Sequence, residues 1–188
     1  MPMPRMPIVW VVLLAIGGWA GAALAAGPGA GYVGSFVGKA VDELVEAGKP
    51  EARDIDIVIS PYKKDGLRIQ WTNVTLVEGR RDVPGVKRRV SESLLVPADG
   101  KDFLVESPEQ SPFRIKDEVD LMRGDAIRWA AFDENGMHVY SFVVLEDGRY
   151  ELQTYTRRLT EEGLDLVFER TVEGKVVRRM TGKAVRAD

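Results

Sequence analysis

From Tyr32 onward the chain consists of short runs in which apolar and polar residues alternate. Turn residues separate these runs at intervals of about 8 to 15 residues. A period of two is typical of a half-buried β-strand, because successive side chains point to opposite faces of a sheet. The pattern therefore predicts an all-β domain of antiparallel strands.

The clearest pair of strands lies in the first half of the domain. Three isoleucines alternate with smaller or polar residues in 54–60, and Leu67, Ile69 and Trp71 continue the alternation after the turn PYKKDG at 61–66. Two alternating runs joined by a turn that ends in Asp-Gly predict an antiparallel hairpin with one buried face.

The second half repeats this pattern five times, with the connections DENG, EDGR, TEEG and VEGK, each of which contains a glycine. The strands expected from the whole pattern are 32–41, 54–60, 67–76, 86–96, 102–105, 126–132, 137–145, 150–158, 164–171 and 176–186. Consecutive hairpins form a meander, and closure of a long meander removes its exposed edges. We expect a single antiparallel up-and-down barrel of about 8 to 10 strands over 32–186, with a two-sheet sandwich as the alternative.

Two segments are ambiguous. Apolar residues in 37–47 also fit helical spacing, and a strand followed by a short helical turn is the favoured interpretation. The pattern lapses over 106–125, which is read either as a connection with a helical turn at 117–122 or as a flap over one barrel mouth. The residues expected inside the barrel are Ile55, Ile57, Ile59, Leu67, Ile69, Trp71, Trp129, Leu152, Leu166 and Phe168.

The start and end of the domain resemble the calycin group of proteins, which comprises lipocalins, fatty-acid-binding proteins and avidins. The opening is a Tyr-x-Gly-x-Phe-x-Gly sequence (32–38), and the last two strands, LDLVFERTVEGKVVRRMTGKAVR, are similar in style to the end of fatty-acid-binding proteins. This lipocalin-like resemblance implies a small barrel that binds a ligand in its lumen.

The first 25 residues have the composition of a secretory signal peptide. Arg5 supplies the positive charge, 8–16 is continuously apolar, and Ala23-Leu24-Ala25 fits the small-x-small cleavage pattern. We expect cleavage after Ala25, a flexible leader over 26–31, and an exported protein that is periplasmic if the source is a Gram-negative bacterium. The alternative is an uncleaved membrane anchor, since 7–26 is long enough to span a bilayer.

Composition excludes several function classes. The chain carries a formal charge of −3, or −4 once Arg5 is removed, so no basic surplus favours nucleic acid as a partner. No cysteine is present and His138 is the single histidine, which excludes a cysteine nucleophile and leaves few zinc ligands. His138 is interpreted as a strand histidine hydrogen-bonded to a neighbour. We expect no enzyme activity, metal or cofactor.

Binding has more support than catalysis. On the period-two rule Arg170 and Arg178 share a face with apolar residues of the last two strands, and the Glu173-Gly174 turn brings them opposite each other. A buried guanidinium needs either an internal carboxylate or an anionic ligand. The candidate ligand-binding residues are Arg170, Arg178, Trp71, Trp129, Tyr150 and Phe168.

The sequence thus predicts an exported barrel without a stable membrane span after cleavage. Its expected partner is a lipid-like, apolar or amphipathic small molecule, because aromatic residues are available to line a cavity. The alternative function is that of a filled barrel that acts through its surface as an envelope interaction module.

Overall fold

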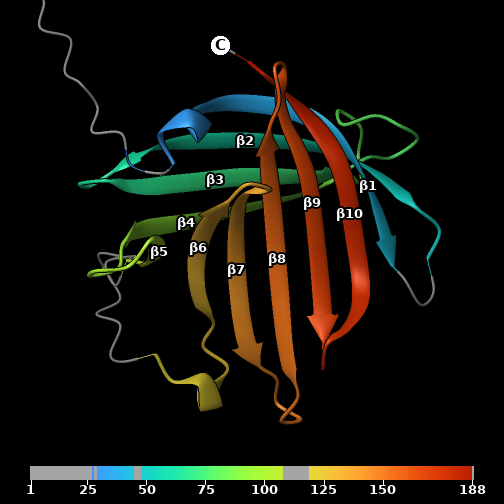
Figure 1. Ribbon diagram of the computed structural model, residues 1–188. Helices are drawn as coiled ribbons and strands as arrows, with labels where there is room; N and C mark the ends of the chain where they lie inside the picture. The colour runs from blue at the N-terminus through green and yellow to red at the C-terminus, as the bar shows by residue number, and fades with distance from the viewer. Residues whose placement is uncertain (1–26, 28, 45–47, 108–118, 188) are drawn as a thin grey trace, which may run out of the picture.

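The structure, a computed structural model, describes residues 27, 29–44, 48–107 and 119–187. It confirms a single closed antiparallel barrel in which each strand pairs with its neighbours in sequence and the last strand returns to the first (Figure 1). The ten strands are β1 (Gly34–Leu44), β2 (Glu51–Tyr62), β3 (Gly66–Thr75), β4 (Lys87–Pro97), β5 (Phe103–Glu106), β6 (Ile127–Asp133), β7 (Gly136–Val144), β8 (Tyr150–Leu159), β9 (Gly163–Val172) and β10 (Lys175–Arg186). This up-and-down topology is like that of the calycins.

The β1–β10 seam that closes the barrel depends on glycine. Gly38 lies opposite Ala184, and a Cβ atom at Gly38 would come within 2.1 Å of the backbone oxygen of Lys183. Gly182, opposite Ala40, has equally little room. The two strands therefore approach more closely than side chains would allow, which lets β1 and β10 curve around the barrel.

The β9–β10 hairpin fixes the register of the last two strands. Its turn residues Glu173 and Gly174 have φ angles of 51° and 75°, the left-handed pair that a two-residue type I′ turn requires. Val172 consequently pairs with Lys175, and the ladder continues past a bulge between Val176 and Arg178.

One half of the barrel interior is filled by a hydrophobic core. Each strand contributes its inward residues from the end near the short 3-10 helix Ala30–Tyr32, and the Tyr32 ring lies 6.1 Å from that of Phe132. Large, fully buried members of the core include Phe36, Ile59, Ile69, Leu95, Met137 and Leu164. This end of the barrel is closed, so any lumenal site lies toward the other end.

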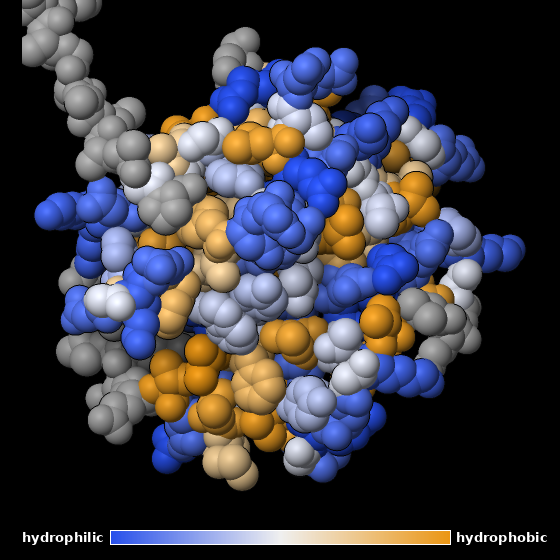
Figure 2. Space-filling view, viewed as in Figure 1, coloured by the Kyte–Doolittle hydropathy of each residue, from blue (hydrophilic) through white to orange (hydrophobic). Residues whose placement is uncertain are grey.

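Two residues expected in the core lie on the outer wall instead. Trp129 alternates with the fully buried Ala130 and stacks on Tyr140 with ring centroids 4.9 Å apart. Leu152 follows Glu151, which is only 4% exposed and faces the lumen, so Leu152 points outward. The prediction was wrong at these positions because the lumen accepts polar side chains on β8 while apolar ones cover part of its outer face. Figure 2 shows apolar side chains over the lower outer surface of β6–β8.

The ambiguous segments are also resolved in part. β1 remains extended through Leu44, so the strand is longer than expected, and 45–47, where the predicted helical turn would follow, lie outside the described residues. Leu121–Arg123 forms a 3-10 helix at the end of the predicted 117–122 turn, whereas 108–118 lie outside the described residues.

The segment before β1 differs from a loose leader where it is described, since Ala30 and Gly31 belong to the first 3-10 helix. The predicted signal peptide lies outside the described residues. Within the part of the chain that the structure covers, no helix combines the length and apolar character required to traverse a bilayer.

Candidate functional site in the barrel lumen

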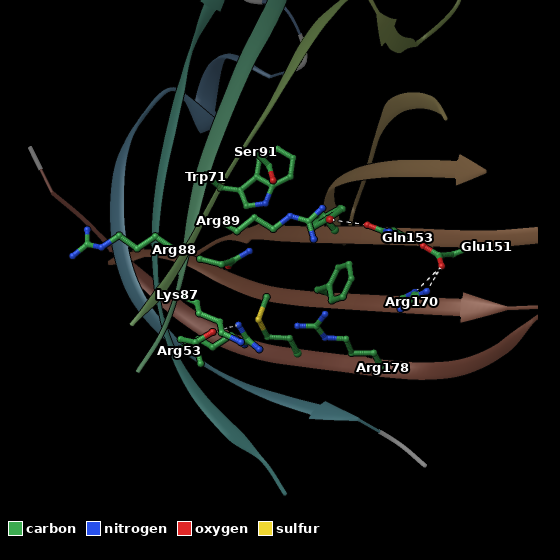
Figure 3. Close-up of a pocket in the computed structure, with 15 residues that line it drawn as sticks. Arg53, Trp71, Lys87, Arg88, Arg89, Ser91, Glu151, Gln153, Arg170 and Arg178 are labelled. Atoms are coloured by element: carbon green, nitrogen blue, oxygen red, sulfur yellow. Dashed lines mark hydrogen bonds and ion pairs between the residues drawn. The ribbon is translucent and has the colours of Figure 1, made fainter. Parts of the chain in front are cut away.

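The half of the lumen away from the core contains a cavity of about 490 Å³, which we call the chamber (Figure 3). Its wall comes from β2, β3, β4, β8, β9 and β10. The lining residues are Arg53, Trp71, Asn73, Thr75, Lys87, Arg88, Arg89, Ser91, Glu151, Gln153, Tyr155, Phe168, Arg170, Arg178 and Met180. A space of this size is typical of small-molecule sites.

Three aromatic rings form the floor of the chamber. The Tyr155 ring lies 5.2 Å from that of Trp71 and 4.7 Å from that of Phe168, both in tilted arrangements. Met180 completes this layer, being the register partner of Phe168. The layer separates the hydrophobic core from the polar chamber and offers an apolar surface to a ligand.

Arg170 and Arg178 both face the chamber and are direct register partners on β9 and β10, as the sequence predicts. Each is compensated by an internal carboxylate. The Arg170 Nε donates to Glu151 Oε2 over 2.7 Å, and the Arg178 Nε donates to Asp42 Oδ1 over 2.7 Å. The repulsion between the two guanidiniums is thus relieved by carboxylates on the two strands that flank the β9–β10 pair.

Asp42 is shared by two arginines. Besides Arg178, it contacts Arg53, whose Nε lies 2.5 Å from Asp42 Oδ2, while Asp42 itself is only 5% exposed. Burial opposes ionisation of the carboxyl, but the hydrogen bonds and charges of Arg178 and Arg53 outweigh it and hold the pKa of Asp42 below its ordinary value. Asp42 is therefore ionised at neutral pH and links β1, β2 and β10.

A second polar chain runs along β8. Gln153 donates through Nε2 to Glu151 Oε1 over 2.6 Å and accepts at Oε1 from the Tyr155 hydroxyl over 2.9 Å. Burial raises the pKa of Tyr155, although Arg157, Arg89, Arg128 and Arg178 act in the opposite direction. Tyr155 thus remains a neutral hydrogen-bond donor within a cationic environment.

The chamber has an excess of positive charge near its mouth. Lys87 and Arg89 line it from β4, and within the described part of the chain neither forms an ion pair with a carboxylate. Figure 3 shows the Arg89 side chain extending into the chamber, whereas Arg88 points away from it. The Arg88 Nη2 donates to the backbone oxygen of Arg81 over 3.3 Å. Two cations are therefore left for an anionic group of a ligand.

A side cavity of about 190 Å³ adjoins the chamber toward β6 and β7. Both spaces share Trp71, Arg89, Ser91, Gln153 and Tyr155 in their walls. Val139 and Val143 contribute apolar surface to the side cavity. A molecule in the chamber can consequently extend past Trp71 and Tyr155 without entering the core.

Four of the six candidate ligand-binding residues lie together in the chamber wall: Trp71, Phe168, Arg170 and Arg178. The other two do not. Trp129 lies on the outer wall, and Tyr150, which is 39% exposed, stacks on Phe142 outside the barrel with centroids 5.9 Å apart. Aromatic character alone predicts both as lumenal, but each is adjacent to an inward residue, Ala130 or Glu151, and therefore points outward.

Sequence reasoning missed the chamber residues Arg53, Arg89, Glu151 and Tyr155, and it missed Asp42, which pairs with Arg53 and Arg178. A signal for them exists in the alternation, because Arg53 continues the parity of the β2 isoleucines and Asp42 that of Phe36 and Ala40. The rule that inward residues are apolar hides this signal when a lumen is half polar.

His138 is a strand histidine hydrogen-bonded to neighbouring side chains, as interpreted from the sequence, and the structure places it on the outer face. Its Nε2 lies 2.9 Å from Asp133 Oδ1 and its Nδ1 lies 3.0 Å from Thr156 Oγ1. The hydrogen bond from His138 lowers the pKa of Asp133. The residues that line the chamber do not include this group, and it fastens the β6–β7 turn to β8.

Comparison with known proteins supplies no family: no protein-family model matches the chain, and neither does any curated protein. Function therefore has to be argued from the chamber itself.

Proposed function

We propose that this protein binds a small amphipathic molecule that carries an anionic group, and that it has no catalytic activity. The observation that carries the proposal is the chamber of about 490 Å³, which combines an aromatic floor with unpaired cations near its mouth. Apolar surface in a concave site supplies affinity, and a few placed charges supply orientation.

The charges of the chamber support an anionic ligand over a neutral one. Arg53, Arg170 and Arg178 are paired with carboxylates, whereas Lys87 and Arg89 add positive charge without a partner among the described residues. A carboxylate or phosphate group would complete the pairing of these two side chains. The apolar part of the molecule would contact Trp71 and Phe168.

We further propose that the protein is exported and acts as a lipocalin-like carrier, periplasmic in a Gram-negative cell. The signal-like composition of 1–25 and the barrel topology support this proposal. A fold without cysteine is held together in an oxidising compartment by its core and its closed sheet alone.

A pair of fluorescent probes tests the ligand class. 1-Anilinonaphthalene-8-sulfonate is an amphipathic anion, and N-phenyl-1-naphthylamine has the same rings without the sulfonate. We expect the anionic probe to bind at least about tenfold more tightly, which corresponds to about 1.4 kcal/mol. Equal affinities would contradict an anion-selective chamber, and no binding of either probe would favour the alternative of a barrel that acts through its outer surface.

Two neighbouring substitutions on β4 locate the binding. Arg89→Gln removes from the chamber a cation that has no carboxylate partner among the described residues. It should lower the affinity for the anionic probe about fivefold, or about 1 kcal/mol. Arg88→Gln removes a cation that points away and should leave affinity unchanged. Equal effects of the two would show that the probe senses only the overall charge of the protein. Native mass spectrometry of the purified protein would then identify a co-purified anion.

A further inference from the structure

A third kind of arginine lies below the aromatic floor. Arg157, on β8, is only 3% exposed and belongs to the inward parity of Glu151, Gln153 and Tyr155. Unlike Arg53, Arg170 and Arg178, it forms no ion pair with a carboxylate of the described residues. Its Nε and Nη1 atoms are buried and have no hydrogen-bond partner there. A charged donor group in this state is costly and needs an acceptor.

The surroundings of Arg157 compensate its charge only weakly. Its Cζ lies 5.6 Å from the centre of the Trp71 ring and 5.8 Å from that of Tyr155, near the outer limit for a cation–π contact. Burial lowers the pKa of Arg157 to about 10, which leaves the guanidinium charged at neutral pH. The inward carboxylates Asp42 and Glu151 pair with Arg178, Arg53 and Arg170, and neither is among the charges that act on the pKa of Arg157.

A small cavity accompanies this unpaired cation. Arg157 lines a space of about 30 Å³ together with Ile55, Ile57, Asn73 and Leu166, at the boundary between the core and the aromatic floor. Such a volume accommodates a single water molecule or an ion of similar size, and nothing as large as an amphipathic ligand. Asn73 also has a buried Oδ1 that has no hydrogen-bond partner among the described residues, and rotation of its amide would present the Nδ2 donors to the same space.

We propose that this inner cavity binds a single small monovalent anion of the halide class, chloride in ordinary buffers, held by the Arg157 guanidinium with the Asn73 amide beside it. The anion would supply the acceptor and the negative charge that Arg157 lacks. The competing occupant is a buried water, which could accept from Arg157 and donate to Asn73 but would leave the charge uncompensated. This site lies beneath the floor and does not depend on the ligand proposed for the chamber.

The direct test uses the unaltered protein. Crystals grown or soaked in 0.3 M sodium bromide should show an anomalous peak beside Arg157, at hydrogen-bonding distance from Nε or Nη1. Absence of a peak, with either water or no density in the cavity, would overturn the proposal.

Thermal unfolding provides the matching solution test. At constant ionic strength, replacement of sodium gluconate by 0.3 M sodium chloride should raise the midpoint of the wild-type protein by about 5 °C, because an ion that binds the folded state stabilises it. Arg157→Met should lose this rise, whereas Arg89→Gln, a chamber cation, should keep it. If Arg157→Met does not fold, the effect of chloride on the wild-type midpoint and the bromide peak still test the proposal. A peak without a chloride-dependent midpoint would indicate an adventitious ion only and would overturn the proposal.

Discussion

Arg170 and Arg178 face each other directly across β9 and β10, yet each forms its ion pair with a carboxylate outside that hairpin. Glu151 on β8 holds Arg170, and Asp42 on β1 holds Arg178. Each of the like charges is therefore compensated from the strand that flanks the β9–β10 pair on its own side. Because the carboxylates already compensate these two arginines, the proposed binding of an anionic group falls to Lys87 and Arg89 on β4, which form no ion pair among the described residues.

Asp42 should be important for stability. Asp42→Asn leaves Arg178 and Arg53 without their shared carboxylate, and we expect a loss of about 2 to 3 kcal/mol in the free energy of unfolding at pH 7, reduced from the fully buried case because Arg178 is partly exposed. Denaturant unfolding would measure it. The double variant Asp42→Asn, Arg178→Met should lose less than the sum of the two single variants.

The same substitution predicts a pH dependence. Because the pKa of Asp42 is lowered in the folded protein, its contribution to stability is present above the ordinary carboxyl pKa of about 3.9 and disappears as the pH falls through the lower folded value. The difference between wild type and Asp42→Asn should therefore shrink below about pH 4. A constant difference down to pH 2 would argue against an ionised Asp42 in the native state.

Tryptophan fluorescence should distinguish the lumen from the outer wall. After cleavage at Ala25 the chain contains two tryptophans, Trp71 in the chamber floor and Trp129 outside. We expect energy transfer or quenching on binding of 1-anilinonaphthalene-8-sulfonate to be largely lost in Trp71→Phe and retained in Trp129→Phe. The reverse result would place the probe on the aromatic outer face of β6 and β7.

The closing seam should not tolerate a methyl group. Gly38→Ala places a Cβ against the backbone of β10, and we expect a cost of about 3 kcal/mol, since backbone atoms cannot step aside as a side chain can. Gly100→Ala is the control: its φ of 63° carries a conformational penalty of about 1 kcal/mol, but no atom lies within 4 Å of the added Cβ. Equal costs would mean that the β1–β10 seam is looser than described.

Export can be checked by mass. Protein recovered from the native cell envelope should begin at Ala26, because cleavage is expected after Ala25. A full-length species in the membrane fraction would instead support the uncleaved anchor.

Local alternation was sufficient to predict the barrel and the β9–β10 register, because a tight turn and a period of two depend on neighbouring residues. It was insufficient on β8, whose sequence YELQTYTRRL places polar residues inward and Leu152 outward. The pairing of Asp42 with Arg178 spans 136 residues and exists only because the barrel closes, so no local pattern could show it. For the same reason no local pattern predicts that Arg157 has no carboxylate partner among the described residues, because this depends on the residues of all the strands around it.

The pairing of β1 with β10 has a consequence for the order of biogenesis. Phe36 is the partner of Arg186, near the last residue that the structure describes, so the sheet has two open edges until the C-terminal strand has been made and, in an exported chain, has crossed the membrane. Contacts between such distant residues also make folding slow. In a nascent chain that lacks β10, the edges of β1 and β9 would expose unpaired backbone N–H and C=O groups, which can pair with other chains. We therefore expect the unfinished barrel to need chaperones that shield unpaired strands.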